Sequence, residues 1–212
     1  MKSIISIISF LFLIAFQASG QEDTDAYKIL DQFSEKALHA PSVSMSFRLI
    51  TNNQADNSID TMGGSVIISR DKYKLELPDN IIWFNGVTSW SYLPEEKEVT
   101  ITKAERKDNS FQNKPSLIFS MYKKGYKTRL ISDKSNSYVI DLYPEDLKGE
   151  LERIRLTIGK SQLDLKILEY RKKDGTIITL NVREYNLTVQ PEPENFVFDP
   201  ENFKGVEVID MR

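Results

Sequence analysis

The sequence predicts a mainly β fold with short helices, arranged as an incomplete, open antiparallel β-barrel of about eleven strands closed by a helical lid. Three observations support this prediction. From Val43 onward, apolar and polar residues alternate with the period of two that is typical of a half-buried strand. Turn residues separate the strand-like runs by only a few positions, which favours antiparallel neighbours. An apolar segment at residues 115–122 interrupts the series at its middle and supplies the predicted lid.

Residues 1–20 have the composition of a signal peptide, with a basic residue near the start, an apolar run at 4–16 and small residues at 18–20. The run is shorter than the roughly 20 residues that a membrane-spanning helix needs. The chain has no cysteine, so it offers no thiol for a lipid anchor or a disulfide. We therefore expect an exported, soluble protein of the bacterial periplasm, with residues 21–212 forming a single domain.

The first element predicted after this segment is an amphipathic helix. Thr24 or Asp25 is available as its N-cap, and Pro41 follows its expected end. Five apolar residues recur at helical spacing and predict its buried side: Ala26, Ile29, Leu30, Phe33 and Ala37.

The remaining predicted elements are mostly strands, in two groups. The first group is expected at residues 43–49, 64–70, 73–77, 80–84, 88–93 and 98–103. The second group is expected at residues 126–132, 137–143, 151–158, 163–171 and 176–185. Asn85-Gly86 and Asp174-Gly175 mark tight hairpin turns, because these residue types accept the positive φ that such turns require.

The hairpin at Asn85-Gly86 places large aromatic residues, Trp90 and Tyr92 among them, on a face of the sheet. An ordinary sheet core is one interpretation of these side chains, and a binding surface is the other.

Residues 115–122 predict a short helix that starts at Pro115. Its residues are apolar over most of the helix circumference, so another part of the molecule must cover them. The mouth of an open barrel is the expected partner.

Composition excludes several classes of function. The net charge is −3 and the basic residues are scattered, which gives no support for binding nucleic acid. The short basic cluster of Lys123, Lys124, Lys127 and Arg129 is interpreted as a solvated face. With no cysteine and a single histidine, thiol nucleophiles and His-rich zinc sites are excluded. We predict no catalytic residue, no metal and no cofactor.

Two side-chain types leave an enzymatic alternative open. His39 lies at the expected helix end, where capping or solvent exposure is the better interpretation. Carboxylates are numerous and are interpreted as surface groups, whereas a hydrolase would need two of them buried and convergent. They are Asp141, Glu145, Asp146, Glu150 and Glu152.

Four stretches of the chain together resemble the outer-membrane lipoprotein carrier family, the LolA/LolB-like proteins. They are residues 26–47, residues 64–77 (GSVIISRDKYKLEL), residues 81–99 with NGVTSWSYLPEEKEV, and residues 196–212 (FVFDPENFKGVEVIDMR). The Asn-Gly-x-Thr-x-Trp-x-Tyr-x-Pro block and the closing Phe-x-Phe-x-Pro and Gly-Val-x-Val-x-Asp blocks are the most specific. The missing anchor cysteine makes the soluble periplasmic carrier the nearer counterpart.

The resemblance implies a periplasmic chaperone whose cavity shields lipoprotein acyl chains between the inner and the outer membrane. The lining and lid residues expected from it are Met45, Phe47, Trp83, Trp90, Tyr92, Leu117, Phe119 and Met121. It further implies that Arg70 bonds carbonyl groups of the lid and acts as a latch, although Asp71 stands where the family has a proline.

The implied partners are acylated lipoproteins as cargo, an inner-membrane ABC-type exporter that supplies them and an outer-membrane acceptor. The protein is expected to be a monomer without nucleic acid. Two alternatives stay open at this point. One is a carrier or sensor for another lipid, a glycolipid or a pigment, and the other is an envelope hydrolase.

Overall fold

The computed structural model describes residues 23–103, 114–133 and 136–212. The predicted signal peptide at 1–20 lies outside these residues. In the described part, one α-helix, α2 (Thr24–His39), is accompanied by four short 3-10 helices. These are η1 (Pro115–Phe119), η2 (Met121–Lys123), η3 (Pro193–Phe196) and η4 (Pro200–Asn202).

Twelve strands make up the rest of the regular structure in the described residues, and they lie close to the predicted runs. They are β1 (Val43–Asn53), β2 (Ser58–Ser69), β3 (Lys72–Glu76), β4 (Ile81–Phe84), β5 (Thr88–Leu93), β6 (Glu98–Lys103), β7 (Tyr126–Ser132), β8 (Ser137–Pro144), β9 (Leu151–Gly159), β10 (Leu165–Lys172), β11 (Thr176–Asn186) and β12 (Glu207–Asp210). Sequence reasoning did not anticipate β12, and it began β2 several residues too late.

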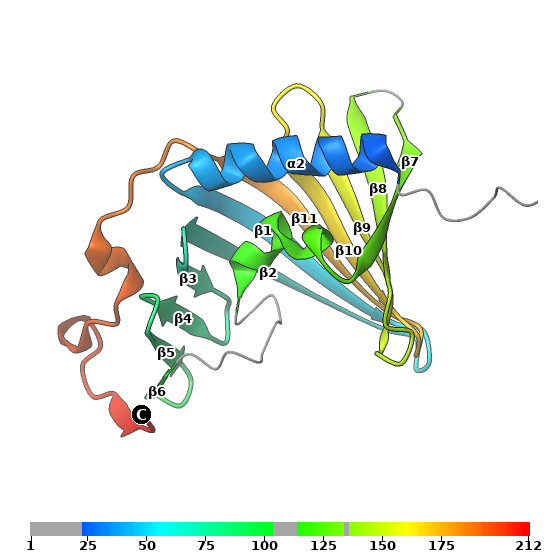
Figure 1. Ribbon diagram of the computed structural model, residues 1–212. Coiled ribbons are helices and arrows are strands. Elements are labelled where there is room, and N and C mark those ends of the chain that lie inside the picture. Colours follow the sequence, from blue (N-terminus) through cyan, green and yellow to red (C-terminus); the bar gives the residue numbers. More distant parts are fainter. Residues whose placement is uncertain (1–22, 104–113, 134–135) are drawn as a thin grey trace, which may run out of the picture.

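All twelve strands belong to one sheet, in the order β12-β6-β5-β4-β3-β2-β1-β11-β10-β9-β8-β7. Every pair is antiparallel except β12 and β6, which run parallel. The edge strands β12 and β7 do not pair in the described structure, so the sheet is curved but not closed (Figure 1). The predicted open antiparallel barrel is thereby confirmed.

Helix α2 crosses the sheet on the face that we call the inner face (Figure 1). All five apolar residues predicted for its buried side are buried there. They pack with inner-face side chains such as Met45, Leu75, Leu142 and Leu156 in one continuous core. The helical periodicity in the sequence therefore identified the correct side of the helix.

Asp23 caps the start of α2, in place of the predicted Thr24 or Asp25, which already belong to the helix. Its Oδ1 accepts a hydrogen bond of 3.2 Å from the backbone N–H of Ala26. Its Oδ2 accepts one of 2.8 Å from the backbone N–H of Leu130, on edge strand β7. The Asp23 carboxylate thus accepts hydrogen bonds from two backbone N–H groups, one at the start of the helix and one on the edge strand of the sheet.

Phe47 needs a glycine opposite it in the inner core. In the register of β1 and β2, Phe47 faces Gly64. A Cβ atom at Gly64 would lie 2.8 Å from the Phe47 ring and 2.8 Å from a methyl carbon of Leu77. The absent side chain of Gly64 therefore provides the space for the aromatic ring.

The outer face of β8 to β10 carries an ion-pair network. Asp141 is fully buried and accepts hydrogen bonds from Nε and an Nη atom of Arg155, at 2.6 and 2.8 Å. These bonds raise the pKa of the Arg155 guanidinium. Arg153 lies 3.6 Å from Asp141 and 2.5 Å from Glu169. The surface location predicted for Asp141 is wrong, because its paired arginines allow the carboxylate to be buried.

We expect Gly64→Ala to lower the free energy of unfolding by about 1–3 kcal/mol, because the new methyl group overpacks the Phe47 ring. Urea denaturation would measure the loss. Gly63→Ala is the matched control, since a Cβ at Gly63 meets nothing nearer than 4.0 Å. Equal stability of the two variants would contradict this account of the core.

We expect Asp23→Ala to cost about 1–2 kcal/mol of stability, because it removes the helix cap and frees the Leu130 N–H. Thermal and urea unfolding would measure this cost. Asp25→Ala provides the comparison, since the Asp25 carboxylate only approaches the exposed Lys28 at 3.8 Å. An equal loss of stability in both variants would contradict a stabilising role of the two Asp23 hydrogen bonds.

Candidate functional site

The segment predicted as a lid lies on the inner face beside α2 and forms two 3-10 helices, η1 and η2, instead of one regular helix (Figure 1). Pro115 opens η1, as predicted. Ser120 separates η1 from η2 with φ −134° and ψ −11°, which is not a helical conformation. The break lets both halves of the lid turn apolar side chains toward the core, and Ile118, Phe119 and Tyr122 are buried.

Ring contacts and a hydrogen bond join the lid to α2. The rings of Phe33 and Phe119 have centroids 5.5 Å apart, and those of Tyr27 and Tyr122 meet edge to face at 5.3 Å. The Tyr122 hydroxyl donates a hydrogen bond of 2.5 Å to the Asp31 carboxylate. Burial, and then this hydrogen bond, raise the pKa of Tyr122 above its usual range. Tyr122 therefore stays protonated and remains a donor at neutral pH.

A cavity of about 330 Å³ lies between the lid and strands β7, β9 and β10. Its lining is apolar and aromatic, with two lysines at the ends of the lid segment. The lining residues are Lys114, Leu117, Ile118, Ser120, Met121, Lys124, Tyr126, Ile154 and Tyr170. Burial raises the pKa of both tyrosines, so the wall of the cavity carries neutral hydroxyl groups.

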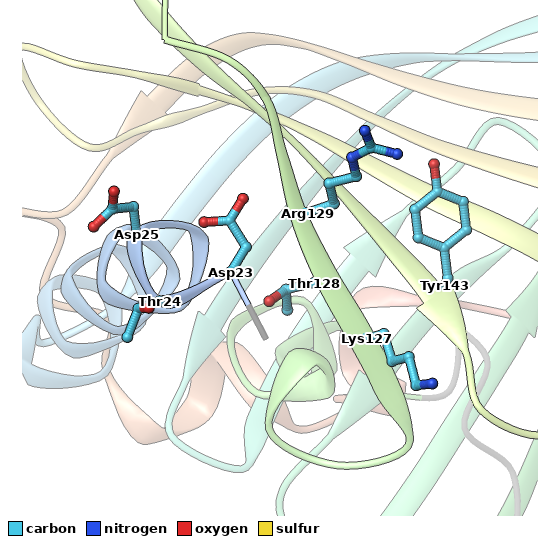
Figure 2. Close-up of a pocket in the computed structure, with 7 residues that line it drawn as sticks. All are labelled: Asp23, Thr24, Asp25, Lys127, Thr128, Arg129 and Tyr143. Carbon is cyan, nitrogen blue, oxygen red and sulfur yellow. The ribbon is translucent and has the colours of Figure 1, made fainter. Parts of the chain in front are cut away.

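A second hollow, of about 540 Å³, lies where the start of α2 meets β7 and β8. Figure 2 shows Asp23, Thr24 and Asp25 at the helix start, opposite residues of the two strands. The strand residues are Lys127, Thr128, Arg129 and Tyr143. Two acids offset two bases here, and Asp23 already holds two backbone N–H groups. This hollow is polar and does not suit an apolar ligand.

Five of the eight predicted lining residues lie on the inner side of the molecule. Met45, Phe47 and Phe119 are buried in the inner core, and Met121 packs against it. Leu117 and Met121 line the cavity under the lid. Contact of these five residues with a ligand stays a prediction.

The other three predicted residues, Trp83, Trp90 and Tyr92, lie on the opposite face of the sheet. Trp83 pairs with Trp90 in the register of β4 and β5, one position away from the inner-face residue Ile82. Directly paired residues share a face, so these aromatics point outward. The structure does not bring them together with Met45 and Phe47. The predicted hairpin is present, but a period of two does not reveal which face is inner.

The C-terminal segment covers these outward aromatics. The ring centroid of Trp83 lies 5.5 Å from that of Phe198 and 5.6 Å from that of Phe203. Tyr92 approaches Phe203 at 4.8 Å. The result is a second, outer core, which corresponds to the interpretation of the hairpin aromatics as ordinary core. The Phe-x-Phe motif at 196–198 was the sequence signal for this partner.

Arg70 does not reach the lid. It lies exposed in the two-residue turn between β2 and β3, with a left-handed φ of 57°. It forms no hydrogen bond or ion pair within the described residues. The polar contact that holds the lid is the one between Tyr122 and Asp31. Sequence reasoning missed this pair, because no spacing rule links a helix residue to one 91 positions away.

The two buried carboxylates of the described part are each paired with cations. Asp164 is buried like Asp141, but it is paired with its own cation, Lys166, at 2.5 Å. His39 is exposed, as predicted, with Nδ1 2.7 Å from the Glu35 carbonyl oxygen. Within residues 23–103, 114–133 and 136–212, no group of three or more potential metal ligands occurs. The four other carboxylates singled out in the sequence are exposed: Glu145, Asp146, Glu150 and Glu152.

None of the helices in the described ranges has the length and apolar character needed to cross a membrane.

Comparison with known proteins finds a matching family model and related sequences. The sequence model of the outer membrane lipoprotein carrier protein LolA matches residues 39–199. The outer-membrane lipoprotein carrier protein of Vibrio cholerae serotype O1 is 25% identical over 189 residues, which cover 86% of this chain and 90% of the relative.

Solved structures give more distant matches. An uncharacterized conserved protein from Thermus thermophilus shares the fold, with a TM-score of 0.59 and 12% identity over 88% of this chain and 99% of that one. A LolA superfamily protein from Nitrosomonas europaea is 14% identical with a TM-score of 0.43, covering 82% of this chain and 98% of that one. The second likeness is too remote to support an argument.

We expect Tyr122→Phe to loosen the lid, because it removes a hydrogen bond to a charged group that is worth about 1.5–3 kcal/mol. Hydrogen exchange at the backbone amides of Ser120 and Lys123 should become faster. The matched control is Tyr143→Phe, which removes a hydroxyl bonded to Asp141 at 3.1 Å on the outer face. Unchanged lid exchange in Tyr122→Phe, or an equal change in the control, would refute the role of this bond.

Proposed function

This chain belongs to the LolA family of outer-membrane lipoprotein carrier proteins, and from that premise we propose that it shields the acyl chains of lipoproteins and carries them from the inner to the outer membrane. Members of the family are carriers and not enzymes. The observation that supports the proposal best is the apolar cavity of about 330 Å³ under the lid.

The physical need for such a carrier follows from the cargo. Each methylene group that leaves water contributes about 0.8 kcal/mol, so an acylated protein does not leave a membrane for an aqueous compartment unless its chains are covered. Binding must also be reversible. Leu117 and Met121 offer adaptable apolar contact without fixed polar partners, which suits acyl chains of different lengths.

The proposal requires the lid and α2 to move. A cavity of about 330 Å³ lies at the lower end of the roughly 300–1,000 Å³ typical of ligand sites. Several acyl chains need more room than that. We infer that the lid and α2 separate from the sheet on loading, and that Met45, Phe47 and Phe119 then contact the cargo instead of α2. Trp83, Trp90 and Tyr92 are not part of this lining, because Phe198 and Phe203 cover them.

The rest of the proposal concerns the route. Residues 1–20 act as a signal peptide, and residues 21–212 work as a single-domain, soluble monomer in the periplasm. An inner-membrane ABC-type exporter supplies the lipoprotein, and an outer-membrane acceptor receives it. In both steps the acyl chains move from one apolar binding site to another, and no covalent bond is formed or broken.

The direct test is release of a triacylated lipoprotein from spheroplasts of the native host when the purified protein is added. Native mass spectrometry of the released complex, with lipid extraction, identifies the cargo. We expect a complex of one carrier with one lipoprotein. Release without a complex, or a complex that holds only another apolar molecule, would contradict the proposed cargo.

We further expect Leu117→Asp to weaken binding of an apolar fluorescent probe at least about tenfold, because it places a carboxylate in the apolar lining. Fluorescence titration measures the affinity. Val87→Asp is the matched control, since Val87 is an exposed apolar residue in the β4–β5 turn. Unaltered binding by a folded Leu117→Asp variant would remove the cavity from the proposed site.

A further inference from the structure

The lid segment concentrates positive charge in an acidic protein. Residues 114–124, KPSLIFSMYKK, contain three lysines and no acid, whereas the whole chain has a net charge of −3. The structure assigns these lysines different surroundings. Lys123 lies over the ring of Tyr122, at 5.7 Å. Lys114 and Lys124 both line the cavity, although they come from opposite ends of the lid.

Neither cavity lysine has its charge neutralised by the described residues. Both side chains are exposed, and neither forms an ion pair or a side-chain hydrogen bond there. Among the described residues that line the cavity there is no aspartate or glutamate. Asp31, the acidic residue of α2 that contacts the lid, is already hydrogen-bonded to Tyr122. The cavity therefore combines an apolar interior with two free cations.

This arrangement separates Lys124 from its sequence neighbours. Lys127 and Arg129 line the other hollow together with Asp23 and Asp25 (Figure 2). Lys124 is exposed, as the sequence interpretation of a solvated basic cluster has it, but it also borders the cavity under the lid. Its structural partner is Lys114, ten positions earlier in the chain.

We propose that the cavity selects amphiphiles whose apolar chain ends in an anionic group, a carboxylate or a phosphate, which Lys114 and Lys124 bind. The apolar chain lies against Leu117, Met121 and Ile154. This inference goes beyond the proposed function and concerns a second class of ligand at the same cavity, because the acyl chains of a lipoprotein are attached through uncharged ester and amide groups. An anion gains there because two uncompensated ammonium groups meet it at the border of an apolar region, where charges interact more strongly than in water.

Two tyrosines add neutral hydroxyl groups to the lining of the cavity. Tyr126 and Tyr170 belong to the lining, and their hydroxyl groups have no hydrogen-bond partner among the described residues. Neutral tyrosine hydroxyls donate hydrogen bonds, which an anionic oxygen accepts well. A ligand with an uncharged ester end would leave these donors and both ammonium groups without an anionic partner.

The test compares two probes that differ only in charge, 1-pyrenedodecanoic acid and its methyl ester, by fluorescence titration of the purified full chain below the concentration of micelle formation. We expect the acid to bind about three- to tenfold more tightly at low salt. The preference should disappear at 1 M salt, where the Debye length is about 3 Å. Equal binding of acid and ester at low salt would overturn the inference.

Paired variants locate the effect. In Lys114→Gln/Lys124→Gln, affinity for the acid should fall to that for the ester, while affinity for the ester stays unchanged. Lys148→Gln/Lys204→Gln is the matched control, because both of these lysines are exposed and form no ion pair in the described structure. An acid preference that survives in the first double variant, or is lost equally in the control, would contradict the assignment.

A third comparison distinguishes the source of the anion. Lysophosphatidylglycerol and lysophosphatidylcholine with the same acyl chain differ in net charge but share a phosphate. Tighter binding of the anionic lipid assigns the site to phospholipid headgroups, whereas a preference for the fatty acid alone assigns it to free carboxylates. Equal binding of charged and uncharged probes refutes only the anion selection. Failure of both pyrene probes to bind also overturns the inference, because the cavity then takes no single-chain amphiphile, and the carrier function is tested separately by lipoprotein release from spheroplasts.

Discussion

Packing of α2 against the inner face of the sheet is the interaction on which the rest of this fold depends. An open sheet leaves one apolar face without a second sheet to cover it, and backbone pairing within the sheet cannot supply that cover. A 16-residue helix is marginal on its own in water, so α2 is stable because its five apolar residues are buried on the sheet. Asp23 fixes where the helix begins, since it bonds the first turn of α2 and the edge strand β7 together.

The same packing positions the lid. Phe33 and Tyr27 of α2 contact Phe119 and Tyr122, and Asp31 accepts the Tyr122 hydrogen bond. Core, lid and cavity therefore share side chains, and a ligand larger than the cavity has to replace part of the core of the protein itself. Such opening is possible only where the contacts that break are few and local, as they are in segments of low local stability. The hydroxyl–carboxylate bond and the two ring contacts between α2 and the lid are local in this sense, whereas the packing of α2 on the sheet has to be replaced by contacts with the ligand.

Sequence patterns predicted the parts of the fold that depend on local periodicity. The helical spacing found every buried apolar residue of the predicted side of α2, and Asn85-Gly86 located the β4–β5 turn. Facts that depend on tertiary neighbours could not be predicted in this way. The outward orientation of Trp83 and Trp90 depends on how β4 pairs with its neighbours. The burial of Asp141 depends on Arg155, which lies on another strand. The Asp31–Tyr122 hydrogen bond depends on the path of the lid. The pattern of one strand or helix contains none of these relations.

The described structure has two separate cores, and the outer one does not depend on α2 or the lid. Trp83 and Tyr92 are held by Phe198 and Phe203 on the outer face, and β12 pairs with β6 at the same end of the sheet. None of these contacts involves α2 or the lid. If α2 and the lid move away from the inner face, the outer core still holds strands β4 to β6 in register. The C-terminal segment, and not the lid, therefore packs against strands β4 to β6 and stabilises this end of the sheet.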